Sequence, residues 1–338
     1  YYGNLYGISI GTTSGIATVS GVRVGTAAAP LINNSGLGTV SELHYTVGIN
    51  VAAGSSTTGI TISGCTVNYI NMPAGSGNTG AMIYGIRLAS TGTVYTITGN
   101  TITHLTTGSS KTTKTMAGII HSGVTAPTVF SRNTIHSFTS TGTSTVEVSG
   151  ISCSGTTTGQ FSLEKNLIHS FGTSSTSTLT VQNGIVIESG VYLVANNMIR
   201  LGVDKDSASV SGNIIINGIS KTTASRSVII FNTAVIGGTV SGSATANTFA
   251  MRRSNSSTSD SLYNNCFVNN RTYSSGTARH YCISTNSAAG IEDNNLFHYT
   301  GIGGAIGSVD GGTTVQTTLA HYRSAFSGRN TNSLFGLP

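Results

Sequence analysis

Tryptophan is absent from this sequence, and charged residues make up only 8% of its 338 residues. The 16 lysines and arginines outnumber the 10 acids and give a net charge of +6, but they are spread thinly. The densest basic groups, Arg252-Arg253 and the segment from Lys111 to Lys114, have no interleaved aromatics, which argues against nucleic-acid binding. Because sugar-binding grooves usually present aromatic platforms, the lack of tryptophan weakens a sugar-binding role without excluding it.

Long apolar runs are also missing. No stretch reaches the roughly 18 residues of a membrane-spanning helix, so no membrane span is expected in this segment. The four cysteines, Cys65, Cys153, Cys266 and Cys282, show no CxxC or Cys/His spacing, which argues against zinc. We interpret them as small apolar fillers, with a Cys266–Cys282 disulfide as the less favoured alternative. We expect no metal and no cofactor. The start at Tyr1 and the end at Pro338 suggest a processed protein or a piece of a longer one.

Glycine, with 44 copies, dominates the sequence together with serine and threonine, and 38% hydrophobic residues are interleaved with them. The apolar residues form short β-branched clusters, such as residues 214–216 and 228–230, bounded by Gly, Asn and Ser. This pattern is typical of strands and turns. Long stretches of good helix formers are absent before residue 318, so the repeats described next are not helical.

Two columns of residues recur along the chain with a period of a little over thirty. The first pairs a small residue with an aliphatic one: Gly7-Ile8, Gly48-Ile49, Gly85-Ile86, Gly118-Ile119, Gly150-Ile151, Gly184-Ile185, Gly218-Ile219, Ala250-Met251 and Cys282-Ile283. The second runs Cys65, Asn100, Asn133, Asn166, Asn197, Thr233, Asn265 and Asn295, each followed two positions later by an apolar residue. Two columns that keep phase over this many repeats predict a solenoid.

Stacked coils about 4.8 Å apart turn each column into a ladder. The aliphatic columns fill the core, and glycine allows either a positive φ or close packing at a corner. An amide ladder at a tight turn is expected for Asn100, Asn133, Asn166, Asn197, Asn265 and Asn295. The sequence therefore predicts an all-β fold, a right-handed parallel β-helix of about nine coils over residues 1–312.

Residues 313–338 are predicted to form a C-terminal capping helix and tail. Thr318 caps a helix whose Leu319, Tyr322 and Phe326 share one face, and Gly328 ends it. Such a helix would cover the last coil, whose strand edges are otherwise unpaired.

These columns resemble those of the right-handed parallel β-helix repeat proteins of the pectate-lyase-like superfamily, in particular the Gly/Ser/Thr-rich secreted and surface proteins of Bacteroidota. The resemblance covers roughly residues 7 to 310. The tail from Thr318 to Tyr322, with Gly328, Asn332-Ser333 and Pro338, is similar to the closing segment of many such domains. Asn330 stands where those tails usually carry Asp.

Many β-helices of this superfamily degrade polysaccharides, but the expected carboxylate pairs are not apparent. Glycoside hydrolysis needs two carboxylates about 5 to 9.5 Å apart, and calcium-dependent lyases need clustered acids. The acids here are Glu42, Glu147, Glu164, Glu188, Asp204, Asp206, Asp260, Glu292, Asp293 and Asp310. Few share a repeat position, and the pairs Asp204/Asp206 and Glu292/Asp293 are interpreted as solvated loops. We therefore predict no catalytic residues and no enzymatic activity.

Histidines occupy equivalent positions in neighbouring coils. His136 and His169 match, Arg200 follows in the next coil and His298 recurs later. Alternation after the Asn turn points these side chains outward. A two-histidine step binding a soft metal is one hypothesis, and exposed polar strand surface is the favoured one. Phe138 and Phe171, two positions further on, are predicted to lie in the core.

The leading hypothesis is a non-enzymatic extracellular structural protein, a fibre, sheath or adhesin subunit of a bacterial surface that associates with itself. Polar loops at one corner of the coils would decorate its surface and contact surface glycans: residues 106–115, 139–145, 172–177 and 202–209. Asp206-Ser207-Ala208 and Asp260-Ser261-Leu262 resemble the O-glycosylation motif of Bacteroidota, which implies modification at Ser207 and Ser261. The alternative is a polysaccharide-degrading or glycan-binding β-helix.

Overall fold

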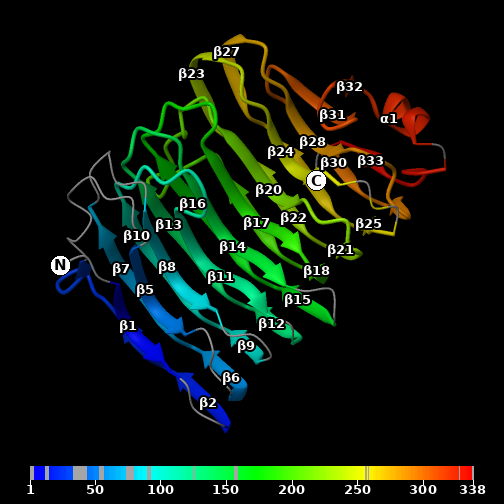
Figure 1. Cartoon of the computed structure of the whole chain (residues 1–338). Helices are drawn as coiled ribbons and strands as arrows, with labels where there is room; N and C mark the ends of the chain where they lie inside the picture. The colour runs from blue at the N-terminus through cyan, green and yellow to red at the C-terminus, as the bar shows by residue number, and fades with distance from the viewer. Residues whose placement is uncertain are drawn as a thin grey trace.

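The computed structural model describes residues 4–11, 15–32, 44–52, 57–73, 80–89, 93–124, 126–155, 159–255, 257, 259–326 and 328–336. Glu42 lies outside the described residues. The chain winds through three sheets in turn, so that strands one coil apart in sequence pair in parallel. Figure 1 shows the coils stacked in chain order, from blue to red. The predicted parallel β-helix is confirmed.

The first sheet, sheet A, consists of β1 (Leu5–Ile10), β5 (His44–Val51), β8 (Ala81–Leu88), β11 (Met116–Val124), β14 (Glu147–Gly155), β17 (Val181–Ser189), β20 (Ile215–Lys221), β24 (Thr248–Arg253), β28 (His280–Thr285), β31 (Gly304–Val309) and β32 (Thr314–Gln316). Sheet B consists of β2 (Gly15–Ser20), β6 (Thr57–Ser63), β9 (Val94–Thr98), β12 (Thr128–Ser131), β15 (Gln160–Glu164), β18 (Val191–Ala195), β21 (Ser227–Ile230), β25 (Ser261–Tyr263) and β29 (Ile291–Asp293).

Sheet C consists of β3 (Arg23–Val24), β4 (Leu31–Ile32), β7 (Thr66–Met72), β10 (Thr101–Thr107), β13 (Thr134–Ser140), β16 (Leu167–Thr173), β19 (Met198–Leu201), β22 (Thr233–Ile236), β26 (Cys266–Asn269), β30 (Leu296–His298) and β33 (Leu334–Phe335). Outside the three sheets lie the pair β23 (Thr239–Ala244) and β27 (Thr272–Gly276), and the helix α1 (Leu319–Ala325).

The first sequence column is a ladder in the core of the rod. Ile119, Ile151 and Ile185 are direct neighbours in sheet A and are fully buried. The glycine before each isoleucine is required by close packing, because a Cβ on Gly118 would lie 2.6 Å from Cγ2 of Ile135 in sheet C. Because Gly118 has no positive φ, close packing is the alternative that holds at this position.

The asparagine column forms a continuous amide ladder at the two-residue turn between sheets B and C. Asn133 Nδ2 donates to Asn166 Oδ1 at 3.0 Å and to the Ile97 carbonyl at 2.9 Å. The same arrangement links Asn100, Asn133, Asn166, Asn197, Asn232, Asn265 and Asn295. These buried amide pairs hold each turn onto the next.

The repeat position assigned from sequence to Thr233 belongs instead to Asn232. Phe231 has a positive φ and directly precedes Asn232, as Arg132 directly precedes Asn133, so the assignment from sequence was one residue too far along the chain. The inward residue that follows is Ala234, which is fully buried, and Val235 faces outward.

Helix α1 packs on the last coils as predicted. Thr318 Oγ1 accepts from the His321 backbone N–H at 3.2 Å. Tyr322 is fully buried, and its hydroxyl donates to Glu292 Oε1 at 2.7 Å. Asn330 Nδ2 donates to the same oxygen at 2.9 Å, which explains why an amide rather than a carboxylate stands there. The solvated-loop interpretation of Glu292 is therefore wrong, because this side chain is 1% exposed and anchors the cap.

Within the described part of the chain, no helix is long and apolar enough to cross a membrane. All four cysteines are free thiols, three of them buried. Burial raises the pKa of Cys282 to about 12, which keeps this thiol protonated.

Candidate functional site

The outer face of sheet C carries a stack of rings that crosses four coils. The ring centroids of Tyr69 and His104 are 4.5 Å apart with planes inclined at 15°, and those of His136 and His169 are 4.9 Å apart and inclined at 6°. Between the two pairs, His104 meets His136 edge-on at 6.3 Å. We call these four residues the ring ladder. It runs along the axis of the rod, across β7, β10, β13 and β16.

A residue with left-handed backbone conformation in each of these strands builds the ladder. Tyr69, His104, Ser137 and Ser170 all have positive φ, between 49° and 63°. A left-handed residue breaks the alternation of a strand, so two consecutive side chains face outward. His104 and His136 thereby become neighbours, although His104 follows its ladder asparagine by four positions and His136 follows its own by three.

Hydroxyl groups hold one nitrogen of each imidazole. Thr103 Oγ1 lies 2.9 Å from His104 Nδ1 and 3.2 Å from His136 Nδ1. His136 Nδ1 is also 2.8 Å from Ser137 Oγ, and His169 has the equivalent contact with Ser170 at 2.8 Å. Fixing Nδ1 orients the ring and leaves Nε2 as the nitrogen that can meet a ligand.

The imidazoles of the ladder are neutral at pH 7. Burial lowers the pKa of His136 to about 4, with smaller contributions from His169 and His104. Burial also lowers the pKa of His104, helped by the charge of Lys205, and that of His169, helped by Arg200. A neutral imidazole accepts a proton or a hydrogen bond, so the ladder offers basic nitrogens beside a tyrosine ring.

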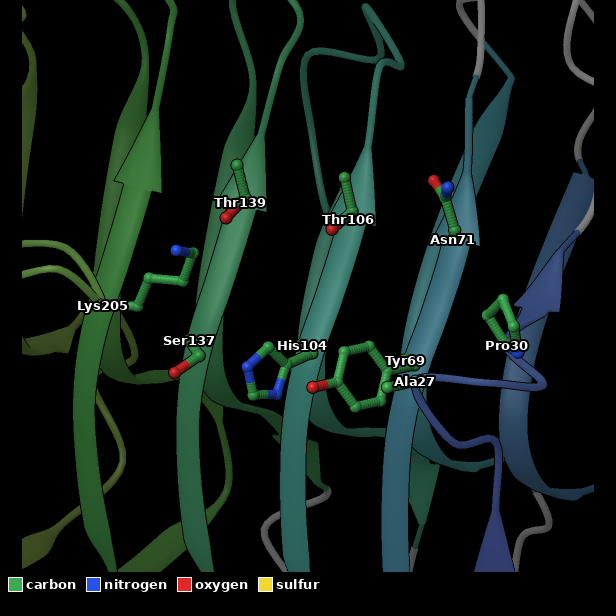
Figure 2. A pocket seen from close by; sticks show the side chains of 9 residues that line it. All are labelled: Ala27, Pro30, Tyr69, Asn71, His104, Thr106, Ser137, Thr139 and Lys205. Carbon is green, nitrogen blue, oxygen red and sulfur yellow. The ribbon is translucent and has the colours of Figure 1, made fainter.

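A hollow of about 250 Å³ lies over the first half of the ladder. Figure 2 shows the rings of Tyr69 and His104 side by side, with Lys205, from the loop after β19, to one side of them beyond Ser137. The residues that line it are Ala27, Pro30, Tyr69, Asn71, His104, Thr106, Ser137, Thr139 and Lys205.

A second hollow, of about 340 Å³, lies at the other end of the ladder. Its lining residues are Leu167, His169, Met198, Ile199, Arg200, Thr233 and Val235. None of the described residues that line either hollow is an acid, and each hollow has one cation, Lys205 or Arg200. Lys205 Nζ pairs with Asp206 at 2.6 Å, and the hydrogen bond in this exposed pair raises the pKa of Lys205. Arg200 forms no ion pair with a described residue, so the second hollow is better suited to an anionic ligand than the first, whose Lys205 is paired with Asp206.

The residues singled out from sequence are partly gathered here. His136, His169 and Arg200 lie in one column and face outward as predicted, and Phe138 and Phe171 stack in the core at 4.7 Å. His298 continues the column but is 7% exposed, and its ring stacks on Phe335.

Tyr69, His104 and Lys205 were not anticipated from sequence as members of a site. The left-handed backbone conformation that aligns Tyr69 with His104 does not change the spacing of apolar residues in the sequence. Lys205 lies far along the chain from the other residues that line the first hollow. One indication of this site was present in the sequence: His104 lies one position away from the repeat position of His136.

A separate polar cluster lies at β14 and β17. Lys114 Nζ pairs with Glu188 at 2.6 Å, and the Lys114 backbone N–H donates to Glu147 Oε2 at 2.9 Å. Asn183 Nδ2 donates to Glu147 Oε1 at 3.4 Å, and burial raises the pKa of Glu147. The structure thus brings together two acids that share no repeat position, one of them paired with a cation and the other shifted towards its protonated form.

The predicted glycosylation positions differ in exposure. Ser207 is exposed in the loop after β19, whereas Ser261 is 7% exposed at the start of β25. Asp260 beside it is fully buried and pairs with Lys221 at 3.0 Å and Arg253 at 2.7 Å. The described residues contain no group of three or more His, Cys, Asp or Glu that would hold a metal ion.

No family model and no curated protein matches the sequence. Two solved structures match, the A-modules of the mannuronan C-5 epimerases AlgE6 and AlgE4 from Azotobacter vinelandii. The first is 11% identical, with 97% of this chain and 91% of that chain covered and a TM-score of 0.26. The second is also 11% identical, with 96% and 91% covered and a TM-score of 0.20. At this identity the likeness is one of fold.

Both matched structures are of enzymes, so the prediction that this chain has no enzymatic activity is wrong as it stood. The prediction depended on the lack of clustered acids. Proton transfer on a sugar does not require carboxylates, because a neutral histidine, a tyrosine or a lysine also serves.

Proposed function

We propose that this chain is a glycan-binding β-helix protein that holds an acidic polysaccharide along the outer face of sheet C. The observation that supports the proposal is the ring ladder itself, a line of stacked rings with a cation in the hollow at either end and no acid among the described lining residues. Successive rings lie one coil apart, with centroids separated by 4.5, 6.3 and 4.9 Å. These separations are similar to the length of one pyranose unit, so a polymer along the axis would meet about one ring at each sugar.

Direct binding to a panel of polymers tests this proposal. Polygalacturonate, alginate and hyaluronan are compared with neutral dextran by calorimetry at low and moderate salt. We expect the acidic polymers to bind, with affinity that falls as salt rises, because the attraction to Lys205 and Arg200 is screened. Equal binding of dextran, or no binding of any acidic polymer at low salt, would contradict it.

The lowered pKa values of the histidines favour a second candidate, proton abstraction from the bound polymer. In a lyase-type reaction, His104 takes the proton from the carbon beside the uronate carboxylate while Lys205 pairs with that carboxylate. The bond from the neighbouring ring carbon to the glycosidic oxygen breaks, its electron pair leaves with that oxygen, which takes a proton from water, and a carbon–carbon double bond forms.

Ultraviolet absorbance of the double bond conjugated to the carboxylate measures this reaction directly. We expect activity in the unmodified chain, loss in His104→Gln, and no change in His321→Gln, whose exposed imidazole lies on α1. Binding without any new absorbance would overturn the reaction and leave the binding proposal standing. The predictions of an extracellular location, of self-association and of glycosylation at Ser207 stay predictions.

A further inference from the structure

The outer face of sheet C changes character along the rod. The first outward position after each turn is Thr101 in β10 and Thr134 in β13, and it becomes Leu167 in β16 and Met198 in β19. Leu167 is 38% exposed and Met198 59% exposed. Two large apolar side chains therefore stand in solvent at a position where the preceding coils carry threonine.

These two side chains line the second hollow beside His169 and Arg200. Arg200 is exposed, and it forms no ion pair with any other residue in the described part of the chain. An apolar wall next to an unpaired guanidinium is suited to a ligand that has an anionic group and an alkyl group close together.

Phe231 extends the apolar wall. It lies at the turn position held by Gly99, Arg132 and Lys165 in earlier coils and by Asn196 and Asn264 in the coils on either side, with a φ of 56°. That conformation is costly for a bulky aromatic residue, and the ring is nonetheless 53% exposed. Phe231 lines a further hollow of about 460 Å³, which shares Thr233 with the second hollow. Backbone strain at an exposed aromatic residue marks a candidate contact for a ligand.

We infer that the second hollow and Phe231 form a subsite for acyl ester groups on the acidic polysaccharide, with Arg200 binding a carboxylate and Leu167, Met198 and Phe231 covering the acyl group. This inference rests on the proposed function and names its substrate class. Continuity supports it, because His169 belongs both to the ring ladder and to the second hollow.

The test compares one polymer in two states, O-acetylated polygalacturonate and the same sample after mild alkaline removal of its esters. We expect the esterified polymer to bind the unmodified chain about tenfold more tightly, which corresponds to partial burial of one or two apolar side chains. In Leu167→Thr/Met198→Thr, which restores the residue of the earlier coils, the two polymers should bind equally.

Leu334→Thr is the matched control. Leu334 occupies the same outward position in β33 and is 66% exposed, but it lines neither hollow. The preference for the esterified polymer should persist in this variant. Equal binding of both polymers by the unmodified chain, or a preference that survives in Leu167→Thr/Met198→Thr, overturns the inference while the proposed function stands.

Two further outcomes are distinct. If neither polymer binds the unmodified chain, the proposed function fails and the subsite fails with it. If sedimentation shows that Leu167→Thr/Met198→Thr converts an assembly into single chains, the apolar wall is a contact between copies and the acyl subsite is overturned.

Discussion

The two halves of sheet C share one inner face and differ on the outer one. Inside, Ile102, Ile135, Ile168 and Ile199 form an unbroken buried ladder. Outside, β10 and β13 present threonine and imidazole, whereas β16, β19 and β22 add leucine, methionine and valine. We refer to them as the imidazole half and the apolar half.

The difference separates the demands of the fold from those of a ligand. Core packing constrains the inner residue of these four coils, because overpacking and cavities are both costly. No such demand acts on the outer residue, so a change from Thr134 to Leu167 leaves the coil intact. Ligand-binding residues are therefore expected at the outer positions where neighbouring coils carry different side chains.

The largest expected effect comes from breaking what the two halves share. Asn166→Ala removes a donor to the Phe130 carbonyl and to Asn197 Oδ1, and an acceptor for the Asn133 amides. Several buried polar groups lose their partners, and we expect a loss of about 4 kcal/mol in the free energy of unfolding, measured by denaturant titration.

Asn264→Gly is the control for this change. Asn264 lies next to the ladder residue Asn265, but it is exposed and has a φ of 58°, which glycine adopts freely. The free energy of unfolding of Asn264→Gly should therefore differ little from that of the unmodified chain. A similar loss in both variants would show that the turn, and not the amide ladder, carries the stability.

The inner face could be predicted from sequence and the outer face only in part. Gly118-Ile119 and Asn133 recur because packing and amide bonding act in every coil, so their period reveals the fold. The prediction was wrong at Thr233, where Asn232 is the ladder residue, because Phe231 takes the position with positive φ that glycine or asparagine usually marks.

The candidate site resisted prediction because it arises from departures from the repeat. The positive φ values of Tyr69 and His104 turn both rings outward, and Lys205 lines the same hollow from a loop in a later coil. Column matching found His136 and His169, which obey the register. It did not bring together Glu147 and Glu188, both of which contact Lys114.

Removing both cations tests whether the halves act on one ligand. In Arg200→Gln/Lys205→Gln we expect roughly tenfold weaker binding of polygalacturonate and a smaller salt dependence, because one charge is lost at each end of the ring ladder. Lys165→Gln is the control, since this exposed side chain lies at the turn and lines neither hollow. If Lys165→Gln weakens polygalacturonate binding equally, the effect would come from the net charge of the protein and not from the two hollows.

Phe231→Asn tests whether the exposed ring next to the apolar half serves a ligand or the fold. Asparagine occupies this position at Asn196 and Asn264, and it tolerates a positive φ better than an aromatic residue does. We expect the free energy of unfolding to rise by about 1 kcal/mol while affinity for an esterified polymer falls. Thermal unfolding and calorimetry measure the two effects, and a destabilised variant would show that the ring supports the fold rather than a ligand.

Acidification acts on the imidazole half and has the smallest expected effect. Burial holds the pKa of His136 at about 4 against an ordinary value of 6.5, so the unfolded chain takes up its proton first. The contribution of this residue to stability is present above pH 6.5 and declines as the pH falls towards 4. A bound polyanion favours the protonated rings and opposes that decline, and its own carboxylates stay largely ionised at pH 5.

We therefore expect polygalacturonate to bind about threefold more tightly at pH 5 than at pH 7, which is less than 1 kcal/mol, and to raise the Tm more at the lower pH. The effect should vanish in His104→Gln/His136→Gln/His169→Gln and persist in Leu167→Thr/Met198→Thr, because the second variant removes no titrating group. A pH dependence that survives loss of the three histidines would place the titrating group elsewhere and separate the ring ladder from polyanion binding.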